Sequence, residues 1–586
     1  MKWQLNRLYP TIELWEKDYE KLEKIIDSLK DFQGKLEKYK NFVTYYKTQK
    51  DLSVLFLKVY QYAALLSDLD RKNTINAARV QKMAYLMSKL NKTTAFESPE
   101  LLSIGKEKID GFIEKNDILK EYTFSIEKLF RNQEHILDNK SESLLANYSQ
   151  LSGQGQEIYS ALSVADKIDK EVILSTGEKV TITSGNYRSY LADLQSADDR
   201  KIVFEAIFSQ YNEHKNTYAQ IYNTVLQKNI AIMKSRNYKS SLESYLHKNN
   251  IPLEVYYNLI DVAKSNTAPI KRYYKLRKDY LGLDIHHTYD RFINLSKSNS
   301  RFTFEEAKEL FFDSIKGFSK DFQEKAHSAV EDGYVDVYEK DGKQTGAYSW
   351  GALNEHPFIL LNFDDTLNSV FTLAHEAGHS MHSLFAAETQ PVATQNYTIF
   401  VAEIASTFNE HNLLDHFIKN AKSTKEDKIT LLQQSIDDIL GTFYRQTLFA
   451  SYELKAHEKA EKGEPITYET LSSIMVDLYK EFYDIDITKE NGKEFVWAYI
   501  PHLFNTPFYV YQYSTSFAAS LRLYELVKEN PENINNHINL LKSGGNDFPV
   551  NQVKKAGIDL TTKEPFMAVV NRLNNLIDEL EVALKE

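Results

Sequence analysis

Helix-breaking residues are scarce in this sequence, and this scarcity constrains the fold more than any other feature. The chain has 12 Pro and 20 Gly in 586 residues, so long stretches contain no residue that ends a helix. Within them apolar residues recur at i, i+3, i+4 and i+7, for example in residues 22–46 and 429–454. This period is typical of amphipathic helices. We therefore predict a mainly α protein, in which the 38 Tyr and 32 Phe fill the interfaces between helices.

Two segments interrupt the helical period. Residues 171–183, EVILSTGEKVTIT, alternate around STGE and predict a β-hairpin. Residues 334–363 predict two or three strands around the turn sequence KDGK. The hairpin is the best candidate for a domain junction, so we expect an N-terminal helical region at 1–195 and a second domain at 196–586.

Composition narrows the class of protein. Cysteine is absent, which suits a reducing compartment. The first 20 residues contain no apolar core of a signal peptide, and no apolar run approaches the ~18 residues of a membrane span. We expect a cytoplasmic protein without a membrane partner. The net charge of −11 argues against general nucleic-acid binding. Composition leaves the oligomeric state open, as a monomer or a homodimer.

Three histidines lie within eight positions in the segment FTLAHEAGHSMHS, residues 371–383. His375, Glu376 and His379 form the pattern H-E-x-x-H, in which two imidazoles one helical turn apart can bind one Zn²⁺. Glu376 lies ~100° around the helix from His375, where it can serve as a general base. The alternative is a helix with two surface or core histidines. The apolar flanks favour a buried helix, and buried imidazoles need partners.

Two further residues of this helix are informative. Gly378 lowers helix stability by ~1 kcal/mol relative to Ala, which makes sense if another element passes close by. His382 lies ~10 Å along the helix from His375, too far to share one ion with it. We expect His382 to support the site or to pack, with metal binding as a minor alternative.

The third metal ligand is expected on the following helix, residues 397–418. Glu403 is a charge inside the apolar run IFVAEIA, and a buried carboxylate without a partner is unfavourable. Glu410 lies seven residues later on the same face, where it could hydrogen-bond a ligand imidazole. A solvated surface position is an equally good interpretation of Glu410.

At this point the chain resembles a known family. The sequences LAHEAGHSMHS and FVAEIASTFNE resemble the oligoendopeptidase F family of thimet-oligopeptidase-like zinc metallopeptidases. GAYSWG and PFILLNF precede these motifs, and HLFNTPFYVYQYS and GGNDFPV follow them, so the resemblance spans about 346–550. It implies a large helical, two-lobed ellipsoid around a deep substrate channel, with a small β-sheet beside the zinc-binding helix. The catalytic domain would be residues 196–586.

The resemblance also implies roles for individual residues. His375, His379 and Glu403 match zinc ligands, one Zn²⁺ per chain, and Glu376 matches the catalytic base. His502 matches a histidine that contacts the substrate or the transition state. A nearby tyrosine donates to the oxyanion in relatives; we favour Tyr513, although the spacing departs slightly from the family pattern. The remaining candidates for substrate binding are Tyr509, Tyr511, Gly346 and Tyr348, and at least one of the tyrosines is expected in the core.

The function expected from these residues is zinc-dependent endopeptidase cleavage of oligopeptides, without action on folded proteins. An extended substrate could pair with the edge of the strand at 357–363. Two alternatives stay open. One is a metallocarboxypeptidase on a related scaffold, for which the sequence locates no cationic group to bind a C-terminal carboxylate. The other is a non-catalytic helical binding protein that contains zinc.

Overall fold

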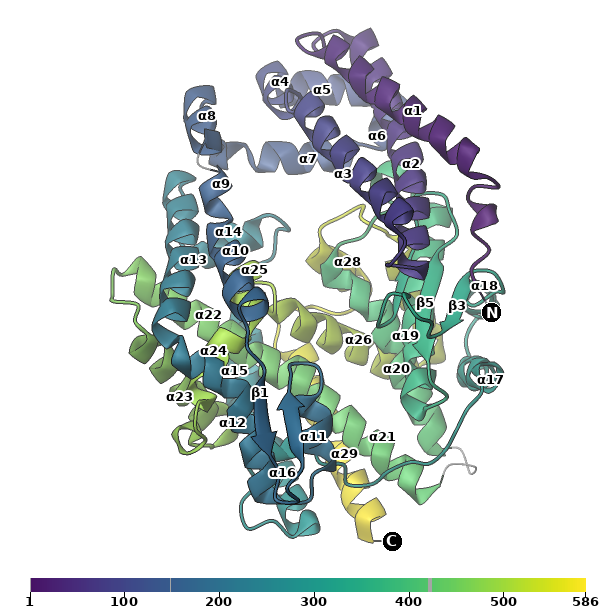
Figure 1. The fold of residues 1–586 in the computed structure, drawn as a ribbon. Helices are drawn as coiled ribbons and strands as arrows, with labels where there is room; N and C mark the ends of the chain where they lie inside the picture. The colour runs from purple at the N-terminus through teal and green to yellow at the C-terminus, as the bar shows by residue number, and fades with distance from the viewer. Residues whose placement is uncertain (1, 148, 420–423, 586) are drawn as a thin grey trace. The chain divides into compact units, whose positions relative to one another are not determined.

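The computed structural model describes residues 2–147, 149–419 and 424–585, and it confirms a mainly α protein (Figure 1). By internal contacts the chain divides into two compact units. Unit 1 comprises Met1–Glu134, Ser300–Asn420 and Ser520–Ile558. Unit 2 comprises His135–Asn299, Ala421–Ala519 and Asp559–Glu586.

The helices divide between the units as follows. The α-helices of unit 1 are α1 (Ile12–Ser28), α2 (Tyr39–Leu69), α3 (Thr74–Thr94), α4 (Glu97–Ile104), α5 (Lys106–Ile113), α6 (Asp117–Lys120), α7 (Thr123–Arg131), α17 (Phe304–Ser314), α18 (Lys320–Ala329), α19 (Leu367–Thr389), α20 (Ile399–Lys419), α27 (Ile534–Lys542) and α28 (Pro549–Lys555). Those of unit 2 are α8 (Asn139–Asn147), α9 (Ser149–Ser152), α10 (Gln154–Ser160), α11 (Tyr187–Asp193), α12 (Ala197–Glu213), α13 (Lys215–Ser235), α14 (Ser241–His247), α15 (Leu253–Ser265), α16 (Ala268–Leu281), α21 (Lys425–Ile439), α22 (Arg445–Glu461), α23 (Tyr468–Tyr483), α24 (Val496–Tyr499), α25 (Pro501–Asn505) and α29 (Glu564–Lys585). The chain passes from unit 2 to unit 1 within α26 (Tyr511–Glu529).

The hairpin expected at 171–183 is present in unit 2. Strands β1 (Lys170–Ile173) and β2 (Lys179–Ile182) pair antiparallel. The domain boundary expected between residues 195 and 196 falls inside unit 2, between α11 and α12. That boundary stays a prediction, since the units are interleaved along the chain.

Unit 1 contains the small sheet expected beside the histidine helix. Its strands β3 (Val335–Tyr338), β4 (Tyr348–Trp350) and β5 (Phe358–Phe363) lie in the order β3-β5-β4. β5 pairs parallel with β3 and antiparallel with β4. β5 is the central strand, with β3 along one edge and β4 along the other at residues 358–360, so the suggestion that a substrate adds to the edge of β5 is wrong for these residues.

The core of unit 1 joins this sheet to the N-terminal helices. Phe358 and Leu360 of β5 belong to the same buried cluster as Trp15 on α1 and Phe42 on α2. The indole of Trp3 donates a hydrogen bond of 2.8 Å to the carbonyl of Ile359. The N-terminal segment and the helices α1 and α2 therefore pack against the sheet and stabilise it.

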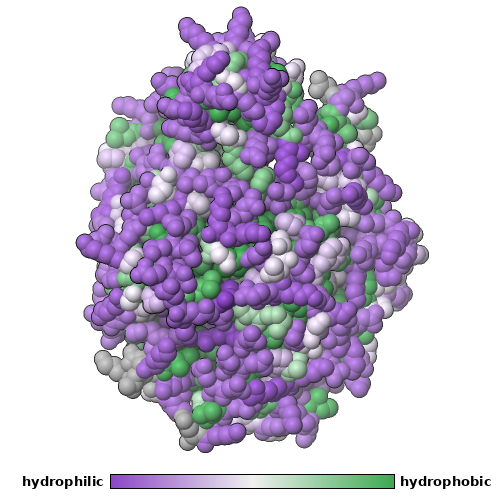
Figure 2. Space-filling view, turned by 180° about the vertical axis from the view of Figure 1, so that it is seen from behind, coloured by the Kyte–Doolittle hydropathy of each residue, from purple (hydrophilic) through white to green (hydrophobic). Residues whose placement is uncertain are grey.

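Helix α2 is long and apolar enough to cross a membrane by length and composition alone. Half of its most apolar stretch is buried inside the protein, and its residues Phe42, Tyr45 and Val59 are fully buried. A core helix meets the same criteria, so α2 carries no conclusion about a membrane. On the face drawn in Figure 2, hydrophilic side chains predominate and hydrophobic ones are scattered between them.

Candidate active site

Helix α19 carries the H-E-x-x-H pattern and is anchored to the sheet at two points. At its start, the side chain of Thr366 accepts a hydrogen bond from the backbone N–H of Ser369, and Asp364 accepts one of 2.6 Å from the Ser369 hydroxyl. Further along, Ser380 and Ser349 of β4 share a hydrogen bond of 2.7 Å. The bonds at Ser369 join the loop after β5 to the first turn of α19, as an N-cap does, and the bond at Ser380 joins the middle of α19 to β4.

Helix α20 packs directly against α19 (Figure 1). At the closest approach a Cβ on Gly378 would lie 2.6 Å from the carbonyl oxygen of Ala405 and from the Cα of Ser406. The expectation that another element passes close to Gly378 is confirmed. The Asn409 amide donates to the carbonyl of Ala374 at 3.1 Å and ties the two helices together.

The structure brings His375, His379 and Glu403 together. The Nε2 atoms of the two imidazoles lie 3.2 Å apart. Glu403 Oε2 lies 3.4 Å from Nε2 of His375 and 3.5 Å from Nε2 of His379. All three side chains are partly exposed, so water has access to the group.

This triangle fits a tetrahedral metal ion. Bonds of 2.0–2.1 Å to a tetrahedral Zn²⁺ separate the ligand atoms by about 3.3 Å. Among the residues that the structure describes, the group consists of three ligand-type side chains. One position of a tetrahedron would stay open, as in catalytic rather than structural zinc sites.

The electrostatics of the group also suit a cation. Burial by itself would lower the pKa of His375, but the carboxylates of Glu410, Glu376 and Glu403 raise it to about 9. Burial would raise the pKa of Glu403, and the two imidazoles with Ser406 lower it to about 2. The site therefore favours added positive charge among its carboxylates.

Glu376 lies on the flank of this group. Its side chain is buried, at 6% exposure, and burial raises the pKa of its carboxyl group. Its Oε2 has no hydrogen-bond partner among the described residues. A buried carboxyl oxygen without a partner is unfavourable, and it is available to a water molecule or a substrate.

Two residues were expected to support the ligands. Glu410 contacts Nδ1 of His375 through Oε1, which leaves Nε2 to face the metal position. His382 is fully buried and stacks on Tyr397, with ring centroids 3.4 Å apart. His382 is therefore a packing residue. The hydroxyl of Tyr397 lies 3.4 Å from the carbonyl oxygen of His379, and no sequence pattern pointed to this tyrosine.

The other expected residues of the site lie in unit 2. His502 is on α25, and its Nε2 lies 3.4 Å from the hydroxyl of Tyr513. The ring of Tyr509 is parallel to that of His502, with centroids 6.0 Å apart. Tyr511 is 3% exposed and packs on Tyr256 in the core. Tyr511 is therefore the core tyrosine expected among the candidates, and substrate binding by Tyr511 stays a prediction.

Gly346 and Tyr348 have structural explanations. Gly346 has φ of +82°, a conformation that favours glycine in turns, and its carbonyl accepts a hydrogen bond of 2.7 Å from Asn362. The hydroxyl of Tyr348 donates to Asp68 on α2. Substrate binding by these two residues stays a prediction.

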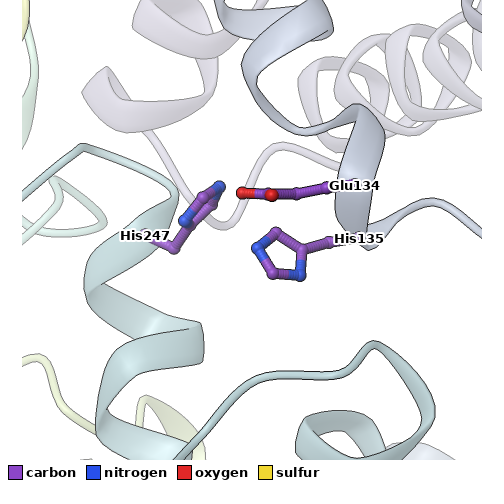
Figure 3. A group of neighbouring side chains, drawn as sticks. All are labelled: Glu134, His135 and His247. Carbon is purple, nitrogen blue, oxygen red and sulfur yellow. The ribbon is translucent and has the colours of Figure 1, made fainter.

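Figure 3 shows a second set of ligand-type side chains, Glu134 and His135 in η3 (Gln133–His135) and His247. His135 stacks on Tyr238 with ring centroids 3.8 Å apart, and its Nδ1 lies 2.8 Å from a backbone carbonyl oxygen. The ring of His247 meets that of His135 edge-on at 4.5 Å. These contacts explain His135 as a packing residue, and we assign no metal to this group.

Two family models match the chain. The model described as peptidase family M3 matches residues 190–571, which is more than half of the chain. The model described as oligopeptidase F matches residues 100–167. The second match covers part of the N-terminal half, in which no diagnostic motif is apparent from the residues alone.

Full-length relatives give the same result. The chain is 34% identical to oligopeptidase PepF of Bacillus subtilis, over 99% of this chain and 87% of the relative. It is 35% identical to group B oligopeptidase PepB of Streptococcus agalactiae, over 99% and 96% of the two chains. The crystal structure of oligoendopeptidase-F from Enterococcus faecium superposes with a TM-score of 0.75 at 27% identity, covering 98% of this chain and 99% of that one.

Proposed function

The chain belongs to peptidase family M3, and from this premise we propose that it is a zinc-dependent endopeptidase that hydrolyses short oligopeptides. The observation that carries the proposal is the triangle of His375, His379 and Glu403, with ligand atoms 3.2 to 3.5 Å apart. A binding protein with structural zinc would have a closed, four-coordinate site. The three partly exposed ligands favour a catalytic site instead.

His375 and His379 would hold the metal through Nε2, and Glu403 through a carboxylate oxygen. When bound, Zn²⁺ supplies Lewis acidity, which makes water more acidic and polarises a carbonyl group. Glu410 keeps the imidazole of His375 in the orientation and tautomer that present Nε2 to the metal. The Ser406 hydroxyl donates a hydrogen bond of 2.8 Å to Glu403 Oε2 and orients that carboxylate.

Glu376 acts as the general base in this proposal. Its unpartnered Oε2 accepts a proton from the water molecule that attacks the scissile carbonyl carbon. The same carboxyl group then gives that proton to the departing amine. A buried position next to the partly exposed metal ligands, with burial raising the pKa of the carboxyl group, suits a group that must both take and return a proton.

His502 and Tyr513 are proposed to contact the substrate carbonyl as it becomes negative. The contact of 3.4 Å between them supports Tyr513 over Tyr509 as the hydroxyl donor. The loss of one such donor lowers kcat by ~10²–10³ in other hydrolases. Cytoplasmic location and the oligomeric state stay predictions.

The experiment compares three purified variants with the parent protein by zinc content and by cleavage of a quenched fluorescent peptide. Glu376→Gln is expected to retain about one zinc per chain and to lose at least ~10²-fold in turnover. Glu403→Ala is expected to lose the metal. Glu388→Gln, an exposed residue of the same helix α19, serves as the matched control and keeps both. Full activity in Glu376→Gln would rule out the proposed mechanism.

A further inference from the structure

Unit 2 contains a cavity of about 860 Å³. This volume lies within the range of ligand sites, ~300–1,000 Å³. His502 and Asn505 of α25 line part of it. The cavity therefore reaches the histidine that the proposed function assigns to the substrate.

Four basic side chains line this cavity, Arg188, Arg291, Arg445 and Lys493. Lys493 is 7% exposed, Arg291 and Arg445 are half-buried, and Arg188 is exposed. Among the residues that the structure describes, no carboxylate oxygen lies within 4 Å of the side-chain nitrogens of Arg291, Arg445 or Lys493. Buried cations are normally paired with an acid, so this cluster lacks its usual partner.

Aromatic rings partly replace the missing acidic partners of these cations. Lys493 Nζ lies 5.3 Å from the ring centroid of Phe208 and 5.4 Å from that of Tyr479. Arg291 lies 4.5 Å from the ring of Phe292. A ring attracts a cation through its quadrupole but, unlike a carboxylate, brings no negative charge to the cluster.

The cations also repel one another. Burial lowers the pKa of Lys493, and the charges of Arg445 and Arg291 lower it further, to about 7. Burial and Arg445 lower the pKa of Arg291 as well. An anion placed among them would relieve both the desolvation and the repulsion.

The acidic groups nearby do not neutralise the cluster. Asp437 and Asp438 line the cavity, but Asp437 accepts a hydrogen bond of 3.0 Å from Tyr273, and burial raises its pKa. Asp438 is exposed. Glu490 attracts Lys493 but accepts hydrogen bonds from Thr288. Four cations therefore share a cavity with two lining carboxyl groups, Asp437 and Asp438.

Two π-helical segments border the cavity. η4 (Ala161–Ala165) contributes Ser163 and Val164, and η7 (Leu440–Tyr444) contributes Gly441 and Thr442. η7 runs directly into Arg445, the first residue of α22. π-Helical turns are rare and are frequently found at functional sites. The geometry that presents Arg445 to the cavity is thus a local departure from the α-helix.

We infer that this cavity binds a carboxylate group of the peptide substrate through Arg291, Arg445 and Lys493. The inference rests on the proposed function, because it names the chemical group by which that enzyme recognises its peptide. Guanidinium groups match carboxylates geometrically and form strong charge-assisted hydrogen bonds. The carboxylate can belong to the C-terminus of the peptide or to an acidic side chain, and the recognition chemistry is the same.

The test uses three quenched fluorescent peptides of one sequence: a free acid, a C-terminal amide, and an amide in which one Gln is replaced by Glu. The parent enzyme is expected to show a kcat/KM about 10- to 100-fold higher for a peptide that carries a carboxylate than for the plain amide. The free acid and the Glu peptide distinguish the two sources. Equal values for all three peptides would overturn the inference.

Variants connect this preference to the cavity. Arg445→Gln and Arg291→Gln are expected to bring the ratio of carboxylate to amide peptides close to one, and Arg445→Lys to restore part of it. Arg272→Gln is the matched control, since Arg272 pairs with Asp578 and Glu581 on the surface and does not line the cavity. If Arg445→Gln fails to fold by circular dichroism, Lys493→Met replaces it. Variants that fold and keep the parent ratio would overturn the inference.

A binding measurement separates this inference from the proposed function. Fluorescence anisotropy of labelled acid and amide peptides is recorded with Glu376→Gln protein, without turnover. Tighter binding of the carboxylate peptides, lost in Glu376→Gln/Arg445→Gln, supports the cavity even if the parent enzyme hydrolyses nothing. Cleavage without any difference between the acid, the amide and the Glu peptide leaves the proposed function intact and rejects the cavity.

Discussion

Glu453 shows how one buried carboxyl group holds the segment beside His502. Phe508 has φ of +53°, a left-handed conformation that bulky residues rarely adopt. Its backbone N–H donates a hydrogen bond of 2.9 Å to Glu453 Oε1, while Oε2 of Glu453 has no partner among the described residues. This bond fixes the chain between α25 and α26, which carry His502 and Tyr513.

The same residue makes stability depend on pH. Burial raises the pKa of Glu453 from 4.5 to about 8, so its contribution to folding is complete below pH 4.5 and declines as the pH rises through 8. Glu453→Gln keeps an acceptor for Phe508 but cannot ionise. Between pH 4.5 and 8, the free energy of unfolding of the Glu453→Gln variant is expected to rise relative to that of the parent. The expected rise is up to about 1.4 kcal/mol per pH unit.

Urea unfolding at pH 5.5 and 7.5 measures this difference. Glu458→Gln, an exposed residue of the same helix α22, is the control and should show no pH-dependent difference from the parent. A constant difference between Glu453→Gln and the parent at both pH values would contradict the prediction.

At the scale of elements, the site depends on how closely α19 and α20 approach. Gly378→Ala adds a Cβ that would lie 2.6 Å from the backbone of Ala405 and Ser406, so α20 must move and carry Glu403 with it. Although Ala favours a helix, we expect a loss of ~1–3 kcal/mol in stability from the clash and weaker zinc binding. Thermal unfolding and zinc titration of the metal-free protein measure both effects.

A matched glycine separates helix propensity from the clash. Gly111 lies inside α5, and a Cβ there would meet nothing within 4 Å. Gly111→Ala should stabilise the protein by ~0.5–1 kcal/mol and leave zinc affinity unchanged. If Gly378→Ala behaves like Gly111→Ala, the close approach of the two helices is not what positions Glu403.

How far the sequence predicts an element depends on the range of the interactions that form it. The pairing of His375 with His379 follows from helix geometry within one turn, and Glu403 was recognisable as a charge in an apolar run. The central position of β5 depends on partners on both sides, which alternation within one strand does not encode. The cavity cations come from Arg291, Arg445 and Lys493, up to about 200 positions apart, so no local pattern could have predicted them.

At the scale of the whole molecule, each of the two units consists of three separate segments of the chain, so no single boundary position in the sequence separates them. The core of the first helices includes Phe358 and Leu360 from β5. The N-terminal segment also contributes Gln61, whose side-chain amide donates a hydrogen bond of 2.9 Å to the carbonyl of Trp350. Sequence patterns identify the helices of residues 1–195, but the strand that completes their core comes more than 150 positions later.

Residues 1–195 produced alone are therefore expected not to form a stable domain, because removal of β5 exposes the apolar side chains that it covers in unit 1. The tryptophans of the fragment are Trp3 and Trp15, and both are buried in the full chain. We expect their fluorescence to shift to the red and thermal unfolding to lose cooperativity, with the full chain measured in the same buffer. A fragment that melts cooperatively with blue-shifted tryptophan emission would mean that the first helices supply their own core, and that the boundary near residue 195 separates true folding units.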